Sequence, residues 1–224
     1  MIMNELTTLA TFLGVRHVLL LASTSKRMRE MLNDKALAWR NCRGTVSERS
    51  LRRMLFKAVK CGSRSAVPRL LAAGANVNVT DRNGEMPLLK AIDKEDVEMV
   101  QVLLNANADV AALQNGTTPL HEAAGHGSTT LVEILLANNA PVNMRDYKYG
   151  GTPLHDACKG CACPHHKNTC ALDAIDMLVR HGAELESSNK YGCTPLGAAC
   201  ESGHVQAVKK VVTVWILYFL DVLN

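Results

Sequence analysis

Apolar residues recur along this chain in short runs that are separated by polar turns. Runs of Leu-Leu or Leu-Val end in small residues or asparagine in "VLLNANADV", "EILLANNAPVN" and "MLVRHGAELE". An earlier partial copy, "VPRLLAAGANVN" at 67–78, has the same ending. Self-similarity of this kind is the signature of internal repeats, and the spacing of the leucines is typical of helices.

A tetrapeptide precedes three of these runs by about twenty residues. Its four copies are "MPLL" at 86–89, "TPLH" at 118–121, "TPLH" at 152–155 and "TPLG" at 194–197. Threonine caps helix N-termini, and proline is tolerated at the first helical position. Each tetrapeptide therefore predicts the start of a helix, with its leucine facing the core.

These motifs resemble the ankyrin repeat over roughly residues 51–210, in four or five copies. The resemblance implies an all-α solenoid of helix-turn-helix repeats with projecting hairpin fingers. We assign it to residues 45–210, with the first and last repeats imperfect. Glycine after the second helix is expected in the left-handed conformation that terminates it. No repeat can bury its own apolar face, so the array is stable only as a stack.

The histidine of "TPLH" invites a catalytic interpretation, which we reject. In the ankyrin family this residue makes structural hydrogen bonds between neighbouring repeats, and the resemblance implies that role for His121 and His155. Leu89 and Gly197 replace it in the other two copies.

Ankyrin folds bind proteins through their finger tips and the exposed face of their first helices. Tyrosine is enriched at binding hot spots, so three tyrosines on fingers are suggestive, with solvated tips as the alternative. The resemblance implies target-binding roles for Asp81, Arg82, Lys90, Gln114, Asn115, Glu122, Arg145, Tyr147, Lys148, Tyr149, Asp156, Lys190 and Tyr191.

Residues 1–44 do not share the repeat period and predict short helices. The segments "LATFL" at 9–13, "VLLLASTSKR" at 18–27 and "NDKALAW" at 33–39 resemble the F-box in order and near-correct spacing, although the usual Leu-Pro opening is absent. The resemblance implies docking on the Skp-family adaptor of cullin-based ubiquitin ligases. The alternative is a helical cap on the first repeat. The residues expected to contact the adaptor are Leu6, Leu9, Phe12, Leu13, Val18, Leu19, Leu20, Lys26, Arg27 and Trp39.

Composition narrows the class of protein. The chain has 224 residues and a net charge of +4, with 47% hydrophobic and only 4% aromatic residues. Its basic excess lies in residues 1–64, with no accompanying nucleic-acid motif, so a solvated helix face is expected. No signal peptide is evident, and the apolar run at 211–220 is shorter than the roughly 20 residues of a membrane span. We expect a soluble cytoplasmic or nuclear protein with reduced cysteines and no nucleic-acid or membrane partner.

The interval between the last two tetrapeptides is longer than the repeat requires. The excess is "CKGCACPHHKNTC" at 158–170. We expect no cofactor, but a structural zinc ion, an unliganded loop and redox chemistry all stay open, and Cys158 also fits a core position. The candidate zinc ligands are Cys158, Cys161, Cys163, His165, His166 and Cys170.

The last segment, 211–224, lacks the usual repeat ending and is rich in apolar residues. Two hypotheses fit it: a truncated or alternative C-terminus, or an apolar helix that caps the last repeat.

Together these patterns predict a non-enzymatic adaptor. The repeats would hold an unidentified target protein while residues 1–44 dock on a cullin ligase. A non-degradative scaffold is the alternative, and a zinc-dependent enzyme is disfavoured because the cysteines share one short loop. Fold alone does not identify the target.

Overall fold

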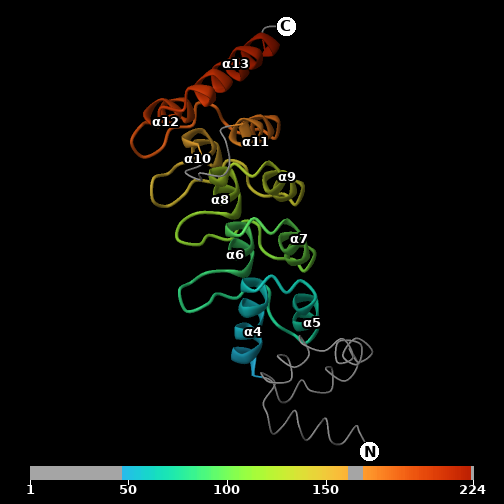
Figure 1. Cartoon of the computed structure of the whole chain (residues 1–224). Coiled ribbons are helices and arrows are strands. Elements are labelled where there is room, and N and C mark those ends of the chain that lie inside the picture. Colours follow the sequence, from blue (N-terminus) through green and yellow to red (C-terminus); the bar gives the residue numbers. More distant parts are fainter. Residues whose placement is uncertain (1–46, 161–168, 223–224) are drawn as a thin grey trace, which may run out of the picture.

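A computed structural model describes residues 47–160 and 169–222 of the chain. Ten helices in these residues pack as five pairs, stacked one on the next along a single axis (Figure 1). There is no strand within the described ranges, only an isolated bridge between Gln114 and Thr117. The pairs are α4 (Glu48–Lys60) with α5 (Ala66–Ala72), α6 (Pro87–Asp93) with α7 (Val97–Asn105), α8 (Pro119–His126) with α9 (Thr129–Ala137), α10 (Pro153–Lys159) with α11 (Thr169–Arg180), and α12 (Pro195–Glu201) with α13 (Val205–Val222).

The tetrapeptides start the first helices of four pairs, as the sequence predicts. Proline is the first residue of α6, α8, α10 and α12. The Thr194 hydroxyl accepts a hydrogen bond from the amide of Gly197 at 3.2 Å, which satisfies one of the free amides at the helix start. Met86 takes the threonine position before α6 and makes no such bond.

The second helices end at a left-handed residue, which the sequence predicts to be glycine. This is confirmed at Gly74 and Gly182, with φ of +95° and +87°. Asn107 and Asn139 adopt the same conformation, each with φ of +60°, after α7 and α9. In all four turns the left-handed residue and the residue after it donate to carbonyls of the last helical turn at 2.9–3.0 Å. Asparagine therefore replaces glycine in the middle of the array.

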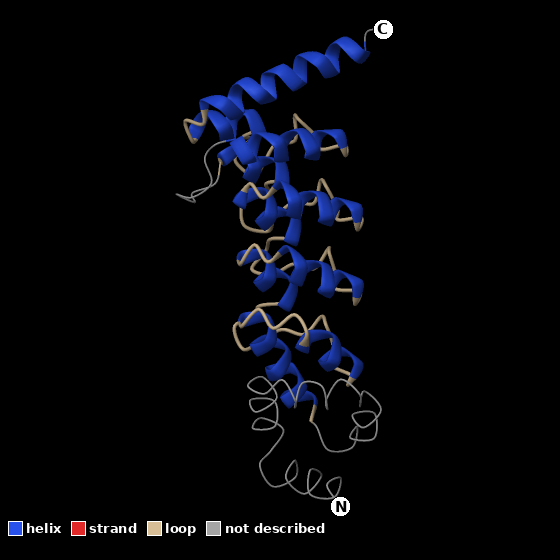
Figure 2. Ribbon diagram, turned by 45° about the vertical axis from the view of Figure 1, so that its right-hand side comes forward, coloured by secondary structure: helices blue, strands red, loops and turns tan. Residues whose placement is uncertain are grey.

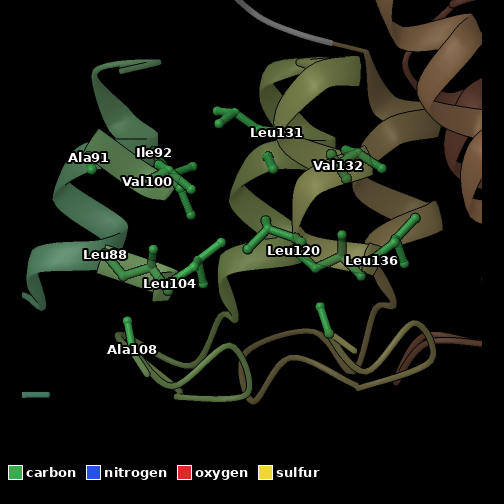
Figure 3. Close-up of a cluster of buried hydrophobic side chains, with 14 of the residues drawn as sticks. Leu88, Ala91, Ile92, Val100, Leu104, Ala108, Leu120, Leu131, Val132 and Leu136 are labelled. Carbon is green, nitrogen blue, oxygen red and sulfur yellow. The ribbon is translucent and has the colours of Figure 1, made fainter. Parts of the chain in front are cut away.

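One continuous apolar core runs the length of the stack, from Leu51 to Val211. Figure 3 shows its central part, where Leu120 and Leu131 meet the side chains of the preceding pair. Complete burial of such a leucine contributes about 2 kcal/mol from the hydrophobic effect alone. The largest fully buried apolar side chains are Leu55, Ile92, Met99, Leu103, Leu120, Leu131, Leu135, Leu154, Ile175 and Leu178.

The apolar C-terminal segment is helical. Helix α13 is unbroken at residue 211, where the sequence suggests a boundary, and its first half packs on α11 and α12. The C-terminal end of α13 extends past the end of the stack (Figure 2), although Trp215 still donates to the Glu186 carboxylate at 3.2 Å. The described part of the segment is therefore helical, and the truncated C-terminus and the capping helix both stay predictions.

Candidate functional site

The loops that connect one pair to the next all project on the same side of the stack as the first helices (Figure 1). We call them fingers one to four and define them as residues 75–86, 108–118, 140–152 and 183–194. The fingers and the first helices form the candidate site. Its geometry depends on how each finger is fixed to its neighbours.

Buried histidines fix the base of fingers three and four. The Nδ1 atom of His121 accepts a hydrogen bond from the Thr118 amide at 3.3 Å, which leaves Nε2 as the donor of the ring. That Nε2 donates to the carbonyl of Gly151 in finger three at 3.1 Å. Helix α8 is thereby fastened to the next repeat, and the structural role predicted for this histidine is confirmed.

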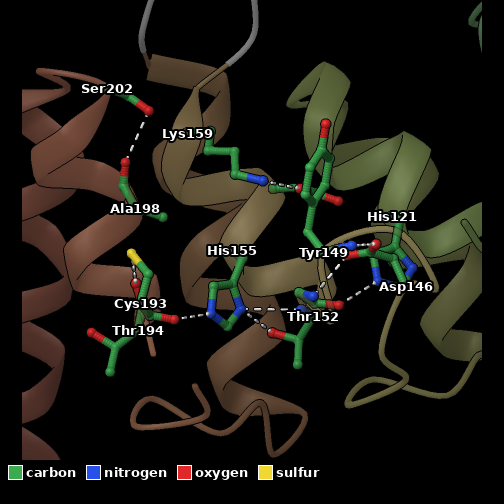
Figure 4. A network of polar contacts seen from close by, with 12 residues as sticks. His121, Asp146, Tyr149, Thr152, His155, Lys159, Cys193, Thr194, Ala198 and Ser202 are labelled. Carbon is green, nitrogen blue, oxygen red and sulfur yellow. Dashed lines mark hydrogen bonds and ion pairs between the residues drawn. The ribbon is translucent and has the colours of Figure 1, made fainter. Parts of the chain in front are cut away.

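His155 repeats this arrangement one unit further along (Figure 4). Its Nδ1 accepts from the Thr152 amide at 3.0 Å, and its Nε2 donates to the carbonyl of Cys193 in finger four, also at 3.0 Å. Both histidines are buried. Burial lowers the pKa of His155 below the ordinary histidine value, which keeps the imidazole neutral.

Backbone hydrogen bonds join the fingers to one another. The amide of Tyr147 donates to the carbonyl of Gly116 at 2.9 Å, and the amide of Lys190 donates to the carbonyl of Tyr149 at 2.8 Å. Gly150, with φ of +69°, allows the second approach, because a Cβ there would lie 3.0 Å from Cγ of Lys190. Fingers two, three and four therefore form a continuous, fixed surface.

Acidic and amide side chains organise each finger from within. The buried carboxylate of Asp146 accepts hydrogen bonds from the amides of Tyr149 and Gly151 at 2.6 and 2.7 Å. Asp81 does the same in finger one, accepting from Asn83 and Glu85. The Asp81–Asn83 bond is an Asx turn, and the other bonds reach amides three to five residues on, so that each carboxylate shapes its own loop.

Several residues predicted to bind a target thus make bonds inside the array. Asp81 shapes its own finger, and the Gln114 amide oxygen accepts from the Met86 backbone of the preceding finger. Arg145 is exposed but donates to the carbonyl of Ser188 at 2.7 Å. The exposed tips of fingers one and two are instead Arg82 and Asn115.

The predicted helix-face residues occupy equivalent positions on three first helices. Lys90, Glu122 and Asp156 each follow the tetrapeptide proline by three residues and are half-buried. Lys90 pairs with Glu85 and Asp93, and the hydrogen bond to Glu85 is the main cause that raises its pKa. Asp156 pairs with Lys159 at 3.0 Å in the same helix, so this face is charged but largely compensated.

Fingers three and four carry the exposed aromatic side chains of the site. Tyr147 and Tyr191 are 71% and 77% exposed, and Tyr149 is 38% exposed. The ring centroids of Tyr149 and Tyr191 lie 6.4 Å apart. The ammonium of Lys148 lies 4.8 Å from the Tyr149 ring centroid, and that of Lys159 lies 5.5 Å away. The structure therefore brings together side chains that the sequence places on two separate loops.

The predicted zinc loop is described only at its edges. Cys158 is completely buried, and burial raises the pKa of its thiol to about 12, which opposes the thiolate form that a metal ligand needs. Cys170 lies in the first turn of α11. The other candidate ligands, Cys161, Cys163, His165 and His166, lie outside the described residues.

A second group of ligand-type side chains was missed by the sequence analysis. Asp93 of α6 and Glu122 and His126 of α8 place one ligand atom each within 4.8 Å of one another. The Nδ1 atom of His126 is buried without a hydrogen-bond partner. Glu122 and His126 are four residues apart on one helix, a signal that sequence reading alone could have used. Lys90, whose ammonium lies 3.5 Å from Asp93, competes with any cation for this site.

The segment that resembles the F-box lies outside the described residues. This applies to all of residues 1–44, including Leu9, Leu13 and Trp39. In the part of the chain that is described, no helix is both long enough and apolar enough to span a membrane.

Stacked helix pairs with projecting fingers define the chain as a helical repeat protein. It matches the family of ankyrin repeats over residues 55–146 and 114–172, as three copies, and again over residues 165–212. The chain belongs to the ankyrin-repeat family. Proteins of this family are generally binding scaffolds rather than enzymes.

Similar proteins come from distant organisms. The chain is 33% identical over 174 residues to an ankyrin repeat protein of Rickettsia bellii, covering 75% of this chain and 65% of that protein. It is 32% identical over 158 residues to human ankyrin repeat and SOCS box protein 16, covering 68% of this chain and 34% of the relative. It is 35% identical over 102 residues to the mouse B-cell lymphoma 3 protein homolog, covering 45% and 22%. The chain thus spans two thirds or less of each of these relatives.

Proposed function

We propose that this chain is the substrate-recognition subunit of a cullin-based ubiquitin ligase. In this proposal the ankyrin array holds a target protein, and residues 1–44 dock on a Skp-family adaptor. The chain itself catalyses nothing, and its contribution is to bring the target close to the ligase. Such a protein would work in the cytoplasm, the nucleus or both.

The observation that carries the proposal is the run of three F-box-like segments that precedes, in the sequence, the repeats with their fixed surface of fingers. The "SKR" at 25–27 and Trp39 belong to that pattern, whereas a simple cap needs neither. Two human relatives are named ankyrin repeat and SOCS box proteins, 16 and 3. Their names indicate that similar repeats occur together with a second module.

A non-degradative scaffold is the second candidate. Solenoids need a polar cap over each terminal repeat. Helix α4 belongs to the first described pair, and its Leu51 and Leu55 are buried. In that case residues 1–44 would only shield the array, and target binding would have a purpose other than ubiquitin transfer.

Co-purification separates these candidates. The full chain and a Leu9→Asp/Leu13→Asp variant would each be expressed with a Skp-family adaptor, and the captured adaptor would be quantified. A Val212→Asp/Leu217→Asp variant is the matched control, because it adds the same charges at exposed positions of α13. Circular dichroism would confirm that the repeats are folded in all three proteins.

We expect the parent and the control to capture the adaptor and the Leu9→Asp/Leu13→Asp variant to lose it. If the folded parent captures none, the ligase role is wrong and the scaffold candidate stands.

A further inference from the structure

The exposed surface of fingers three and four has a chemistry that narrows the class of its partner. We propose that Tyr147, Lys148, Tyr149, Lys190 and Tyr191, here called the tyrosine-lysine patch, bind an acidic protein segment that also carries an aromatic or aliphatic side chain. The inference deepens the target-binding half of the proposed function and does not depend on adaptor docking.

The aromatic part of the patch offers area for contact. Tyr147 and Tyr191 expose most of their surface, and the Tyr149 ring centroid lies 4.8 Å from the Lys148 ammonium and 6.4 Å from the Tyr191 ring centroid. Tyrosine combines a large apolar ring with few rotatable bonds, which is why it recurs at binding hot spots. Fingers one and two present Arg82, Asn83 and Asn115 and have no aromatic side chain at their tips. The patch is therefore a local feature of the array.

The backbone of the patch is already fixed. The amides of Tyr147 and Lys190 donate to the neighbouring fingers, and the Asp146 carboxylate holds the turn that carries Tyr149. The Lys190 ammonium donates to the backbone carbonyl of Tyr147, which ties the tips of the two fingers together. A surface ordered before binding loses less conformational entropy when the partner arrives.

The charge of the patch selects an acidic partner. Among the described residues, neither Lys148 nor Lys190 has a carboxylate within salt-bridge distance. The nearby carboxylates are otherwise engaged: Asp146 is buried against backbone amides, and Asp156 pairs with Lys159. Two ammonium groups beside three tyrosines would attract glutamate or aspartate, while the rings would cover an apolar side chain of the same segment.

A single-stranded nucleic acid is a less suitable occupant. Such strands follow a positively charged groove and stack successive bases on aromatic rings. Here the patch has two cations without a carboxylate partner among the described residues, Arg145 of finger three donates to the Ser188 carbonyl, and the Tyr149 and Tyr191 rings are inclined at 44° to each other. The observations therefore favour a protein segment, and RNA binding is included as an outcome of the test.

The test is selection of peptides on the purified full chain. A phage-displayed library of random twelve-residue peptides would be panned against the parent. The strongest binder would then be synthesised with a fluorescent label and titrated by anisotropy. We expect selected peptides rich in Asp or Glu together with Phe, Tyr, Trp or Leu, and binding that weakens as NaCl is raised.

Two variants and one control define the result. Lys148→Glu, and the pair Tyr147→Ala with Tyr191→Ala, should each weaken the peptide by about tenfold or more. Arg82→Glu makes the same charge change on the exposed tip of finger one and should leave binding within about twofold of the parent. All four side chains are exposed, so the fold should tolerate these changes.

Other results would overturn the inference. These are selected peptides without acidic residues, equal weakening by Arg82→Glu and Lys148→Glu, or tighter binding of a twelve-nucleotide oligouridine than of the peptide. Adaptor capture is measured separately, so failure of the ligase proposal would leave this result unaffected.

Discussion

The central repeats and the last repeat begin with nearly the same tetrapeptide but differ at its fourth residue. In the centre, His121 and His155 each fasten their helix to a carbonyl of the following finger. In the last pair Gly197 takes this position, and a Cβ there would lie 2.8 Å from Sγ of Cys193. Helix α12 nevertheless forms, with Thr194 as its N-terminal cap. The histidine is thus a connection to the next repeat and not a requirement of the helix that carries it.

Burial follows the same division. Leu131 and Leu135 of α9 are completely buried between neighbouring pairs, whereas Val212, Ile216 and Leu217 of α13 are 38–57% exposed. Apolar residues in similar helical positions contribute to stability only when a neighbouring repeat covers them. Stability in this array therefore comes from coupling between repeats.

The largest difference should come from core leucines. We expect Leu154→Ala to lower the free energy of unfolding by about 2–5 kcal/mol, because it removes a fully buried side chain and leaves a cavity. Leu217→Ala on α13 should change it by less than about 0.5 kcal/mol, since that side chain is 57% exposed. Urea denaturation followed by circular dichroism measures the free energy of unfolding of both variants. Equal losses would contradict the claim that only covered apolar residues contribute to stability.

The histidine connection should have the next largest effect. His155→Ala leaves the Thr152 amide and the Cys193 carbonyl without their partner, which should cost about 1–3 kcal/mol. His181→Ala is the control, because this exposed residue follows α11 and its only described side-chain hydrogen bond is to the Met177 carbonyl of that helix. A loss at His181 as large as that at His155 would contradict a special role for the buried histidines.

The left-handed helix ends provide a smaller effect. Asn139→Ala should lower stability by about 1 kcal/mol, because alanine adopts φ of +60° only with strain. Asn105→Ala, in the last turn of α7, should be neutral or slightly stabilising, since alanine is the better helix former. Thermal unfolding of the two variants measures this difference, and a loss at Asn105 would mean that helix ends are not specified by the left-handed residue.

The smallest expected effect is a dependence on pH. Burial lowers the pKa of His155, so the unfolded chain takes up a proton at this residue more readily than the folded chain does. The stability linked to His155 is therefore complete above about pH 6.5, the ordinary histidine value, and is lost as pH falls through the lower folded pKa. The slope of stability against pH between 7 and 5 should be shallower in His155→Gln than in the parent. An unchanged slope would contradict this.

Much of this architecture follows from sequence. The Thr-Pro start of α8, α10 and α12 depends on residues next to each other in the chain, and the prediction of their position was accurate for that reason. The role of His121 came from the family resemblance, and the hydrogen bond to Gly151 confirms it. The asparagine helix ends were missed because only glycine was expected there.

The candidate site was less predictable because its chemistry depends on contacts between distant residues. Asp81 and Arg82 are adjacent polar residues of one finger, yet Asp81 shapes the loop and Arg82 is exposed. The contact of Gln114 with Met86 and the approach of Tyr149 to Tyr191 join separate repeats, so local patterns contain no sign of them. Sequence predicted the projecting fingers correctly but did not separate their internal residues from their exposed ones.

The central claim is that coupling between repeats stabilises the array. Amide hydrogen exchange across the full chain tests this claim most directly. The claim predicts the slowest exchange in α8 and α10, where histidines fasten each pair to the next, and faster exchange in α13 after Val211. His155→Ala should then accelerate exchange in both α10 and finger four. Uniform protection from α6 to the end of α13, unchanged by His155→Ala, would contradict the account.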